Sequence, residues 1–286
     1  MTQSYAVRPM MDADVPAWDA FVATCPEATF FHRAGWKRVV HDSFGHTCHH
    51  MLAERSGRIV GILPLVEVRS RLFGHALISN GWSVCGGPAV TDEGAREALD
   101  AAAERLLSES GADYLEYRCP RRVKETWQTR SDLYAGFSGP LPADEAANLK
   151  QIPRKQRAVV RKAIESSLRH RIDRDVEDFY SLYAISVRNL GTPVFSRAYF
   201  ANLLSVFGSD CDILTICDGA RPIASVLNFY HGGSVLPFYT GSIPGARRLG
   251  ANDLMYWRLM RHAVERGCSV FDFGRSKVGT GPYDFK

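Results

Sequence analysis

The 286-residue sequence lacks the segments that mark membrane, secreted and disulfide-stabilised proteins. No run approaches the roughly 18 consecutive apolar residues that a membrane-spanning helix needs. The first five residues, Met-Thr-Gln-Ser-Tyr, do not begin a secretory signal, because no basic region followed by an apolar one is present. The seven cysteines are odd in number and form no Cys-x-x-Cys pair, which is typical of reduced thiols. We therefore expect a cytoplasmic globular protein.

Common catalytic and metal-binding motifs are also absent. The sequence has no Gly-x-Ser-x-Gly and no P-loop Gly-Lys-Ser/Thr, so serine hydrolases and nucleoside triphosphatases are disfavoured. His41, His46, His49 and His50 cluster in the first half, but no cysteine or carboxylate completes a metal-ligand spacing. Adjacent strand residues such as His49 and His50 also face opposite sides. We expect no metal site.

Basic residues are concentrated just beyond the middle of the chain. The net charge is only +4, but arginine and lysine are dense between residues 154 and 174. Arg154, Arg157 and Arg161 lie at spacings of three and four, which places them on one face of a helix. Such a face favours anionic partners, namely phosphorylated sugars, lipid head groups or RNA. A solvated helix face that binds nothing is the alternative interpretation.

The two halves of the chain show the same order of expected elements. Each half has two helices, a hairpin, a strand, a helix and a closing strand, judged by hydrophobic spacing and turn residues. We expect these elements at residues 14–24, 34–42, 48–54, 58–68, 82–85, 92–110 and 113–118, and at 176–189, 197–207, 212–217, 222–230, 235–241, 252–266 and 269–273. The pattern predicts a duplicated α/β fold with domains at 1–140 and 141–286. The joint is expected within 136–148, where Gly139-Pro140-Leu141-Pro142 breaks regular structure.

One turn in the second half carries a specific pattern. Arg247-Arg248-Leu249-Gly250-Ala251-Asn252 lies between an expected strand and an expected helix. It is similar to the Gln/Arg-x-x-Gly-x-Gly/Ala turn of the GNAT acyltransferase fold, in which backbone N–H groups at a helix start receive a pyrophosphate. Arg247, Gly250 and Asn252 are therefore the candidate cofactor-binding residues. Asn252 replaces a small residue of that turn, so we expect coenzyme A binding to be weak or absent.

Three further segments extend this resemblance to a family. They are Phe-Tyr-Thr-Gly-Ser at 238–242, Phe-Asp-Phe-Gly-Arg at 271–275 and Gly-Thr-Gly-Pro-Tyr-Asp-Phe-Lys at 279–286. Over nearly its whole length the chain resembles the Fem family of peptidoglycan-bridge aminoacyl transferases, which have two tandem GNAT-like domains. It looks most like the FemAB-like subset associated with exosortase, PEP-CTERM and exopolysaccharide systems.

The resemblance implies an aminoacyl or acyl transferase that forms an amide on a phosphorylated cell-envelope or exopolysaccharide precursor. Its co-substrate would be aminoacyl-tRNA or acyl-CoA, with no permanently bound cofactor, and its partners would include a sugar or lipid-linked acceptor and not DNA. Lys286 would stabilise the developing oxyanion, and Tyr239 would bind the acceptor or relay a proton. The other residues expected to bind substrate are Phe285, Tyr283, Arg275, Lys277, Arg154, Arg157 and Arg161.

Departures from the family pattern keep other functions open. The pair Cys119-Pro120 stands where the family often has Asp-Pro, and no segment of about 40 residues has the heptads of the helical hairpin that some members are thought to use for tRNA. The family continues past the position of Lys286, so a longer natural protein is left open. One alternative is an acetyl-CoA-dependent N-acetyltransferase. The other is a non-catalytic module that binds RNA or anionic lipid through the basic segment.

Overall fold

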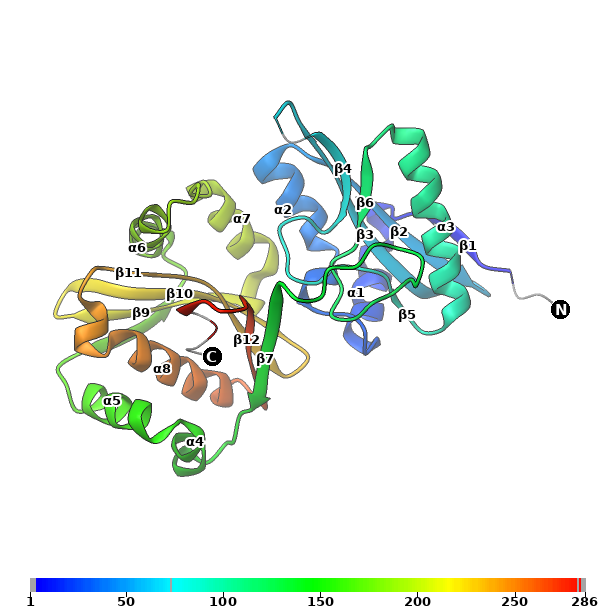
Figure 1. The fold of residues 1–286 in the computed structure, drawn as a ribbon. Coiled ribbons are helices and arrows are strands. Elements are labelled where there is room, and N and C mark those ends of the chain that lie inside the picture. The colour runs from blue at the N-terminus through cyan, green and yellow to red at the C-terminus, as the bar shows by residue number, and fades with distance from the viewer. Residues whose placement is uncertain (1–3, 73, 282, 284–286) are drawn as a thin grey trace. The chain divides into compact units, whose positions relative to one another are not determined.

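Two compact units make up the computed structural model, which describes residues 4–72, 74–281 and 283 (Figure 1). The units are Met1–Ser131 and Asp132–Lys286. This division lies earlier than the expected boundary after residue 140, because β7 (Tyr134–Pro140) pairs with β12 (Val270–Lys277) of the second unit. The segment around Gly139 and Pro140, expected to break regular structure, is thus the end of a strand.

The first unit is a sheet with its helices packed against it. Strands β1 to β4 pair antiparallel in chain order, β6 pairs parallel with β4, and β5 adds to β3. The strands are β1 (Ala6–Pro9), β2 (Thr47–Arg55), β3 (Arg58–Ser70), β4 (Gly74–Ser79), β5 (Ala89–Val90) and β6 (Tyr114–Glu116). The helical segments are η1 (Asp12–Asp14), α1 (Val15–Thr24), η2 (Phe30–His32), α2 (Gly35–Phe44) and α3 (Glu93–Ser110).

The second unit repeats this plan with additions. Its sheet has the order β7-β12-β11-β10-β9-β8, in which only the β11–β12 pair is parallel among the described strands. The remaining strands are β8 (Arg169–Asp173), β9 (Cys211–Asp218), β10 (Arg221–His231) and β11 (Ser234–Ser242). The helical segments are α4 (Glu145–Gln151), α5 (Arg154–Ile164), α6 (Val176–Asn189), α7 (Arg197–Phe207), η3 (Gly208–Asp210), η4 (Ala246–Leu249) and α8 (Ala251–Glu265).

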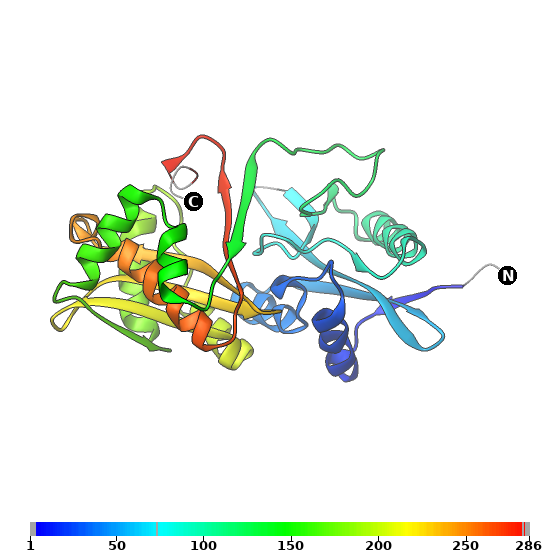
Figure 2. The same ribbon diagram turned by 90° about the horizontal axis from the view of Figure 1, so that it is seen from below.

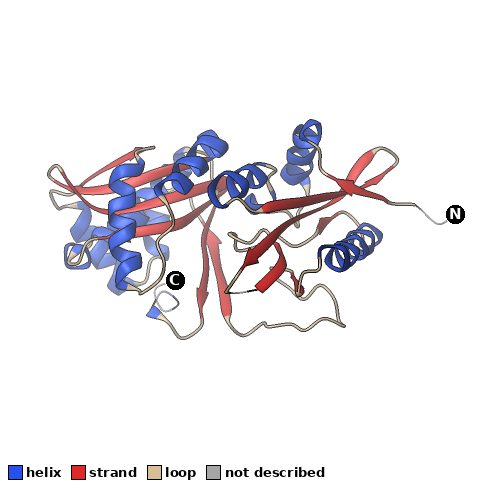
Figure 3. Ribbon diagram, turned by 90° about the horizontal axis from the view of Figure 1, so that it is seen from above, coloured by secondary structure: helices blue, strands red, loops and turns tan. Residues whose placement is uncertain are grey.

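Helices cover both faces of the second sheet. Helices α5 and α8 lie side by side on one face, and α6 and α7 lie on the other (Figures 1 and 2). Figure 3 shows the same helices and strands coloured by type. These layers make the second unit a complete α/β/α arrangement in which each sheet face has its own helices.

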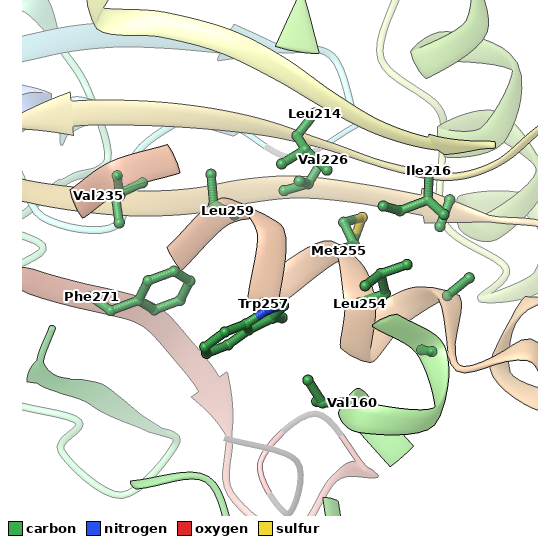
Figure 4. Packing of buried hydrophobic residues seen from close by; sticks show 14 of the residues in the cluster. Val160, Leu214, Ile216, Val226, Val235, Leu254, Met255, Trp257, Leu259 and Phe271 are labelled. Atoms are coloured by element: carbon green, nitrogen blue, oxygen red, sulfur yellow. The ribbon is translucent and has the colours of Figure 1, made fainter. Parts of the chain in front are cut away.

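The core beneath α8 explains why this helix is held so firmly on the sheet. Leu254, Trp257 and Leu259 of α8 are at most 1% exposed and belong to one apolar cluster with residues of β9, β10 and β12 (Figure 4). Val160 of α5 joins the same cluster. Burying one large apolar side chain contributes about 1.5–3 kcal/mol, so this contact fixes both helices against the strands.

The expected duplication of an α/β fold is confirmed, but one expected strand is wrong. Residues 82–85 are irregular, and the fourth strand is β4, which precedes them. The chain leaves β4 at Asn80, which adopts a positive φ of 45° and accepts a hydrogen bond at its carbonyl oxygen from the Ser83 N–H at 3.0 Å. The apolar residues Trp82 and Val84 thus belong to a loop in which both are partly buried.

In the residues that the structure describes, no helix is long and apolar enough to cross a membrane.

Candidate active site

The turn that joins β11 to α8 is built by glycine and by backbone hydrogen bonds. Gly245 and Gly250 have φ values of 97° and 68°, a region that side-chain-bearing residues avoid. Between them the Arg248 N–H donates to the Gly245 carbonyl at 2.9 Å, and the Gly250 N–H donates to the Arg247 carbonyl at 3.1 Å. Gly250 occupies the N-cap position of α8, so no side chain caps this helix. Its first turn can therefore present backbone N–H groups to an anion.

Gly250 also brings this turn against the basic helix. A Cβ atom at Gly250 would lie 3.2 Å from Cβ of Ala163 and 3.3 Å from Cγ1 of Val159, both on α5. A second link is the amide Nε2 of Gln156, which donates to Oδ1 of Asp253 in α8 at 2.9 Å. Two features that were predicted independently, the turn and the arginine-rich helix, are thus neighbours in the fold.

The outer face of α5 carries a shallow basic pocket of about 500 Å³. Arg154 and Arg161 are exposed there, and their guanidinium groups make no hydrogen bond or ion pair to any described residue. Arg157 differs, because its guanidinium donates to the carbonyl oxygens of Lys150 at 2.7 Å and Ile152 at 2.9 Å. It therefore holds the end of α4 as well as lining the pocket. The full lining is Arg154, Arg157, Ala158, Arg161, Lys162 and Glu165.

Strand β11 parts from β12 soon after the two strands meet. Their parallel register covers only Ser234–Val270 and Val235–Phe271. Beyond these pairs β11 continues along β10, whereas β12 continues along β7. Among the described residues the two strands therefore share no further ladder. Tyr239 lies on the diverging part of β11.

Tyr239 is held in a shell of aromatic rings. A bulge opposite Leu227 and Asn228 leaves Phe238 outside the β10–β11 register. The Tyr239 ring contacts those of Phe238 and Phe200 with centroids 4.7 and 5.3 Å apart. Burial of the phenol raises the pKa of Tyr239 above its usual range, although the residue as a whole is only partly buried. The phenol is therefore protonated at neutral pH and can donate a hydrogen bond, but it is a poor base.

Strand β12 places the predicted cations along the edge beside β7. The Arg275 guanidinium carbon lies 4.5 Å from the ring centroid of Tyr134, so this side chain leans toward β7 instead of the β11–β12 gap. Lys277 is exposed and lies opposite Tyr134 in the register. The Tyr283 ring meets that of Phe137 edge-on at 5.3 Å. Phe285 and Lys286 lie outside the described residues.

The corresponding region of the first unit is filled by its own chain. Strands β4 and β6 are also parallel, but the loop after β4 turns back, and the Gly86 N–H donates to the Arg118 carbonyl at 3.0 Å. A side chain at Gly87 would collide with Sγ of Cys119. Helix α3 is capped by Asp92, whose carboxylate accepts from the Ala95 N–H at 3.0 Å. Neither feature was expected from the sequence, although an aspartate before a helix is a recognisable cap.

No cluster of three or more histidine, cysteine or carboxylate side chains in the described part of the chain could hold a metal ion. His49 instead bonds Glu67, its Nε2 lying 2.9 Å from Oε2, and His50 is buried in the core.

Comparison with known proteins agrees with this geometry. Residues 149–286 match the family model described as "Acetyltransferase (GNAT) domain". The second unit has a GNAT-type fold. The matched residues include the basic helix α5, the aromatic shell and the turn before α8, so the chain carries an acyltransferase domain. No curated protein matches the sequence.

Solved structures extend the likeness over both units. A crystal structure of FemX has a TM-score of 0.71 at 13% identity, covering 96% of this chain and 90% of that chain. A tandem GNAT protein from the clavulanic acid biosynthesis pathway has a TM-score of 0.58 at 14% identity, covering 99% and 93%. The C-terminal domain of a putative lysylphosphatidylglycerol synthetase from Agrobacterium fabrum has a TM-score of 0.55 at 15% identity, covering 93% and 79%. At these identities the likeness shows the fold, which is that of tandem GNAT proteins.

Proposed function

We propose that the chain is an aminoacyl or acyl transferase that forms an amide on a phosphorylated cell-envelope or exopolysaccharide precursor. The reaction belongs to the second unit. The observation that carries this proposal is the junction at Gly250, where an uncapped helix start packs against α5, whose outer face carries Arg154 and Arg161 with no side-chain partner among the described residues. The helix start offers backbone donors, and the outer face of the neighbouring helix offers positive charge, to a substrate with more than one anionic group.

The chemistry requires little beyond this arrangement. An amine attacks an activated ester or thioester, and the enzyme has to hold both partners and stabilise the oxyanion. Tyr239 supplies a protonated hydroxyl from β11, the strand that leads into the turn before α8. Lys286 supplies the cation in this proposal, on the strength of the sequence resemblance. The donor is an aminoacyl-tRNA or an acyl-CoA.

The class of acceptor is proposed from the relatives by fold. FemX and a putative lysylphosphatidylglycerol synthetase are among the structures that share the architecture. Both names point to acceptors of the cell envelope, and the exposed cations of α5 suit a phosphorylated or lipid-linked one. The exosortase-associated subset is our proposed placement, and a peripheral membrane contact follows from a lipid-linked acceptor.

A radiolabelled transfer screen tests this function. Labelled aminoacyl-tRNAs and acetyl-CoA are each paired with nucleotide-sugar and lipid-linked acceptors, and the product is tested for an amide. The double variant Arg154→Gln/Arg161→Gln is expected to raise KM for the acceptor at least about tenfold, since each charge-assisted contact contributes roughly 1.5–3 kcal/mol. Arg105→Gln is the matched control, because Arg105 is an exposed arginine of α3.

Absence of transfer with every pair would contradict the proposal. Salt-dependent RNA or anionic-lipid binding without turnover would favour a non-catalytic module instead.

An acetyl-CoA-dependent N-acetyltransferase is the second candidate, favoured by the GNAT match and the uncapped α8. Asn252 argues against it, because its side chain occupies space that a smaller residue leaves for the pyrophosphate. We expect calorimetry with acetyl-CoA to show weak or no binding. Micromolar affinity that is abolished by Arg247→Ala would favour the second candidate. It would also contradict the expectation that this turn binds coenzyme A weakly or not at all.

A further inference from the structure

Tyr239 has a partner that the sequence did not indicate. The hydroxyl oxygens of Tyr199 and Tyr239 lie 3.0 Å apart, within hydrogen-bond distance. Tyr199 is on α7 and is 0% exposed, whereas Tyr239 is partly exposed. One hydroxyl of the pair therefore belongs to a fully buried residue, and the other belongs to a residue that is only partly buried.

The surrounding contacts leave the pair little freedom. The rings of Tyr183, Phe195 and Phe200 surround Tyr239 with centroids 5.3 to 6.0 Å away. Helix α6 lies directly on β11, because a side chain at Gly241 would collide with the backbone at Tyr183. The hydroxyl of Ser186 accepts from the Ser242 N–H at 2.9 Å, which joins the helix to the strand end. The strand and both helices thus hold the two phenols in one geometry.

Burial also keeps both phenols protonated. It raises the pKa of Tyr199 and of Tyr239 above the usual range for tyrosine. Each hydroxyl carries one proton and can both donate and accept. If Tyr199 donates to Tyr239, the proton of Tyr239 stays available for a second bond, and the first bond strengthens the second.

We propose that Tyr199 is a positioning residue for the transfer reaction, which aims the Tyr239 hydroxyl as a hydrogen-bond donor at the reacting carbonyl. This rests on the proposed function. In the reaction the C–N bond forms, the C–O or C–S bond to the leaving group breaks, and one proton passes from the amine to the leaving group or solvent. Tyr239 keeps its own proton throughout and stabilises the oxyanion by donation alone.

A double-mutant cycle tests the coupling through turnover. Tyr199→Phe, Tyr239→Phe and the double variant are compared in the transfer assay with the radiolabelled aminoacyl-tRNA or acetyl-CoA donor. We expect Tyr199→Phe to lower kcat about 3- to 10-fold with KM nearly unchanged, which matches the loss of one hydrogen bond. On the Tyr239→Phe background, Tyr199→Phe should lower kcat no further. Equal losses on both backgrounds would overturn the proposal, because a structural role does not depend on the Tyr239 hydroxyl.

A second measurement works without any substrate. 3-Fluorotyrosine is placed at position 239, and its 19F resonance is compared between the parent, Tyr199→Phe and the control Tyr180→Phe. Tyr180 belongs to the same aromatic cluster, its ring centroid 6.2 Å from that of Phe200. We expect the resonance to move only in Tyr199→Phe. An unchanged resonance there would overturn the positioning, whereas a shifted resonance with no transfer under any condition would overturn the proposed function instead.

Discussion

Helices α3 and α8 follow corresponding strands in the two units, yet a side chain caps the N-terminus of α3 and none caps that of α8. The N-terminus of α3 is closed by Asp92, whose carboxylate also accepts from the Tyr5 hydroxyl at 2.7 Å and pairs with Arg55 at 3.2 Å. That of α8 begins at a glycine and has no side-chain cap. A carboxylate of the protein occupies in the first unit the position that an external anion can occupy in the second.

The charges around the two helices differ in the same way. In the first unit Glu27 holds Arg96 at 2.9 Å, and Glu67 holds His49, Arg69 and His75. In the second, Arg154 and Arg161 have no such partners among the described residues. The comparison teaches that the two units share a fold but differ at this helix start, and we propose that only the second has an open anion site. It also makes the difference between the units testable.

The largest expected effect concerns the cation that we assign to the second unit. Lys286→Ala should lower turnover about a hundredfold or more, because a positioned cation stabilises the transition state by ~3 kcal/mol. Acceptor binding should change little. The control is Lys124→Ala in the first unit, where the ammonium pairs with Glu104 and lies 5.2 Å from the Trp127 ring centroid. Steady-state kinetics of both variants decide the matter, and near-normal turnover of Lys286→Ala would refute the assignment.

The next effect compares two glycines with the same backbone conformation. Gly250 and Gly111 have φ values of 68° and 67°, but no atom lies within 4 Å of a Cβ at Gly111, whereas Ala163 and Val159 crowd one at Gly250. We expect Gly111→Ala to lower the free energy of unfolding by about 1 kcal/mol and Gly250→Ala by about 2–3 kcal/mol. Urea unfolding measures both. Equal losses would mean that the α5–α8 contact at Gly250 is loose.

The third prediction concerns Glu67 of the first unit, whose carboxylate is paired with basic side chains. Burial opposes ionisation of Glu67, but hydrogen bonds from His49, Arg69 and His75 outweigh it and lower its pKa to about 2, from 4.5. The ionised form therefore stabilises the fold above pH 4.5, and this contribution is lost as pH falls toward 2. We expect Glu67→Gln to lower the free energy of unfolding by about 2 kcal/mol at pH 7. Near pH 2 the free energy of unfolding of the variant should approach that of the parent.

Urea unfolding at several pH values checks this prediction. Glu97→Gln on the exposed face of α3 is the control and should stay within about 0.5 kcal/mol at every pH. A cost for Glu67→Gln that does not diminish in acid would contradict the ionic explanation.

The smallest effect tests the cap itself. Asp92→Ala removes the carboxylate at the start of α3 and should cost about 1 kcal/mol, the usual value of an N-cap side chain. Turnover should be unchanged, since we place the reaction in the other unit. Thermal unfolding and the transfer assay are run on the same preparation. A variant that loses activity while staying folded would show that the first unit takes part in the chemistry.

Local signals predicted much of this fold and part of the site. Hydrophobic spacing located the long helices α3 and α8, and Gly250 marked a turn because a positive φ there tolerates little else. Spacing could not reveal β7, since alternating small and aromatic residues around Gly136 and Pro140 suggest a loop until β12 supplies the partner strand. Conversely, the local pattern of residues 82–85 suggested a strand, although these residues form a loop.

The amino-acid sequence alone determined which chemical groups this protein has: a glycine at a helix start, arginines at helical spacing, and a tyrosine on the strand before the turn. These depend on neighbours within a few residues, which periodicity and backbone conformation report directly. Only the tertiary structure decided that α5 lies against the start of α8, that Tyr199 reaches Tyr239, and that Arg157 holds the end of α4. Such contacts join residues from separate elements, and packing of whole helices against a sheet sets them, which no local pattern encodes.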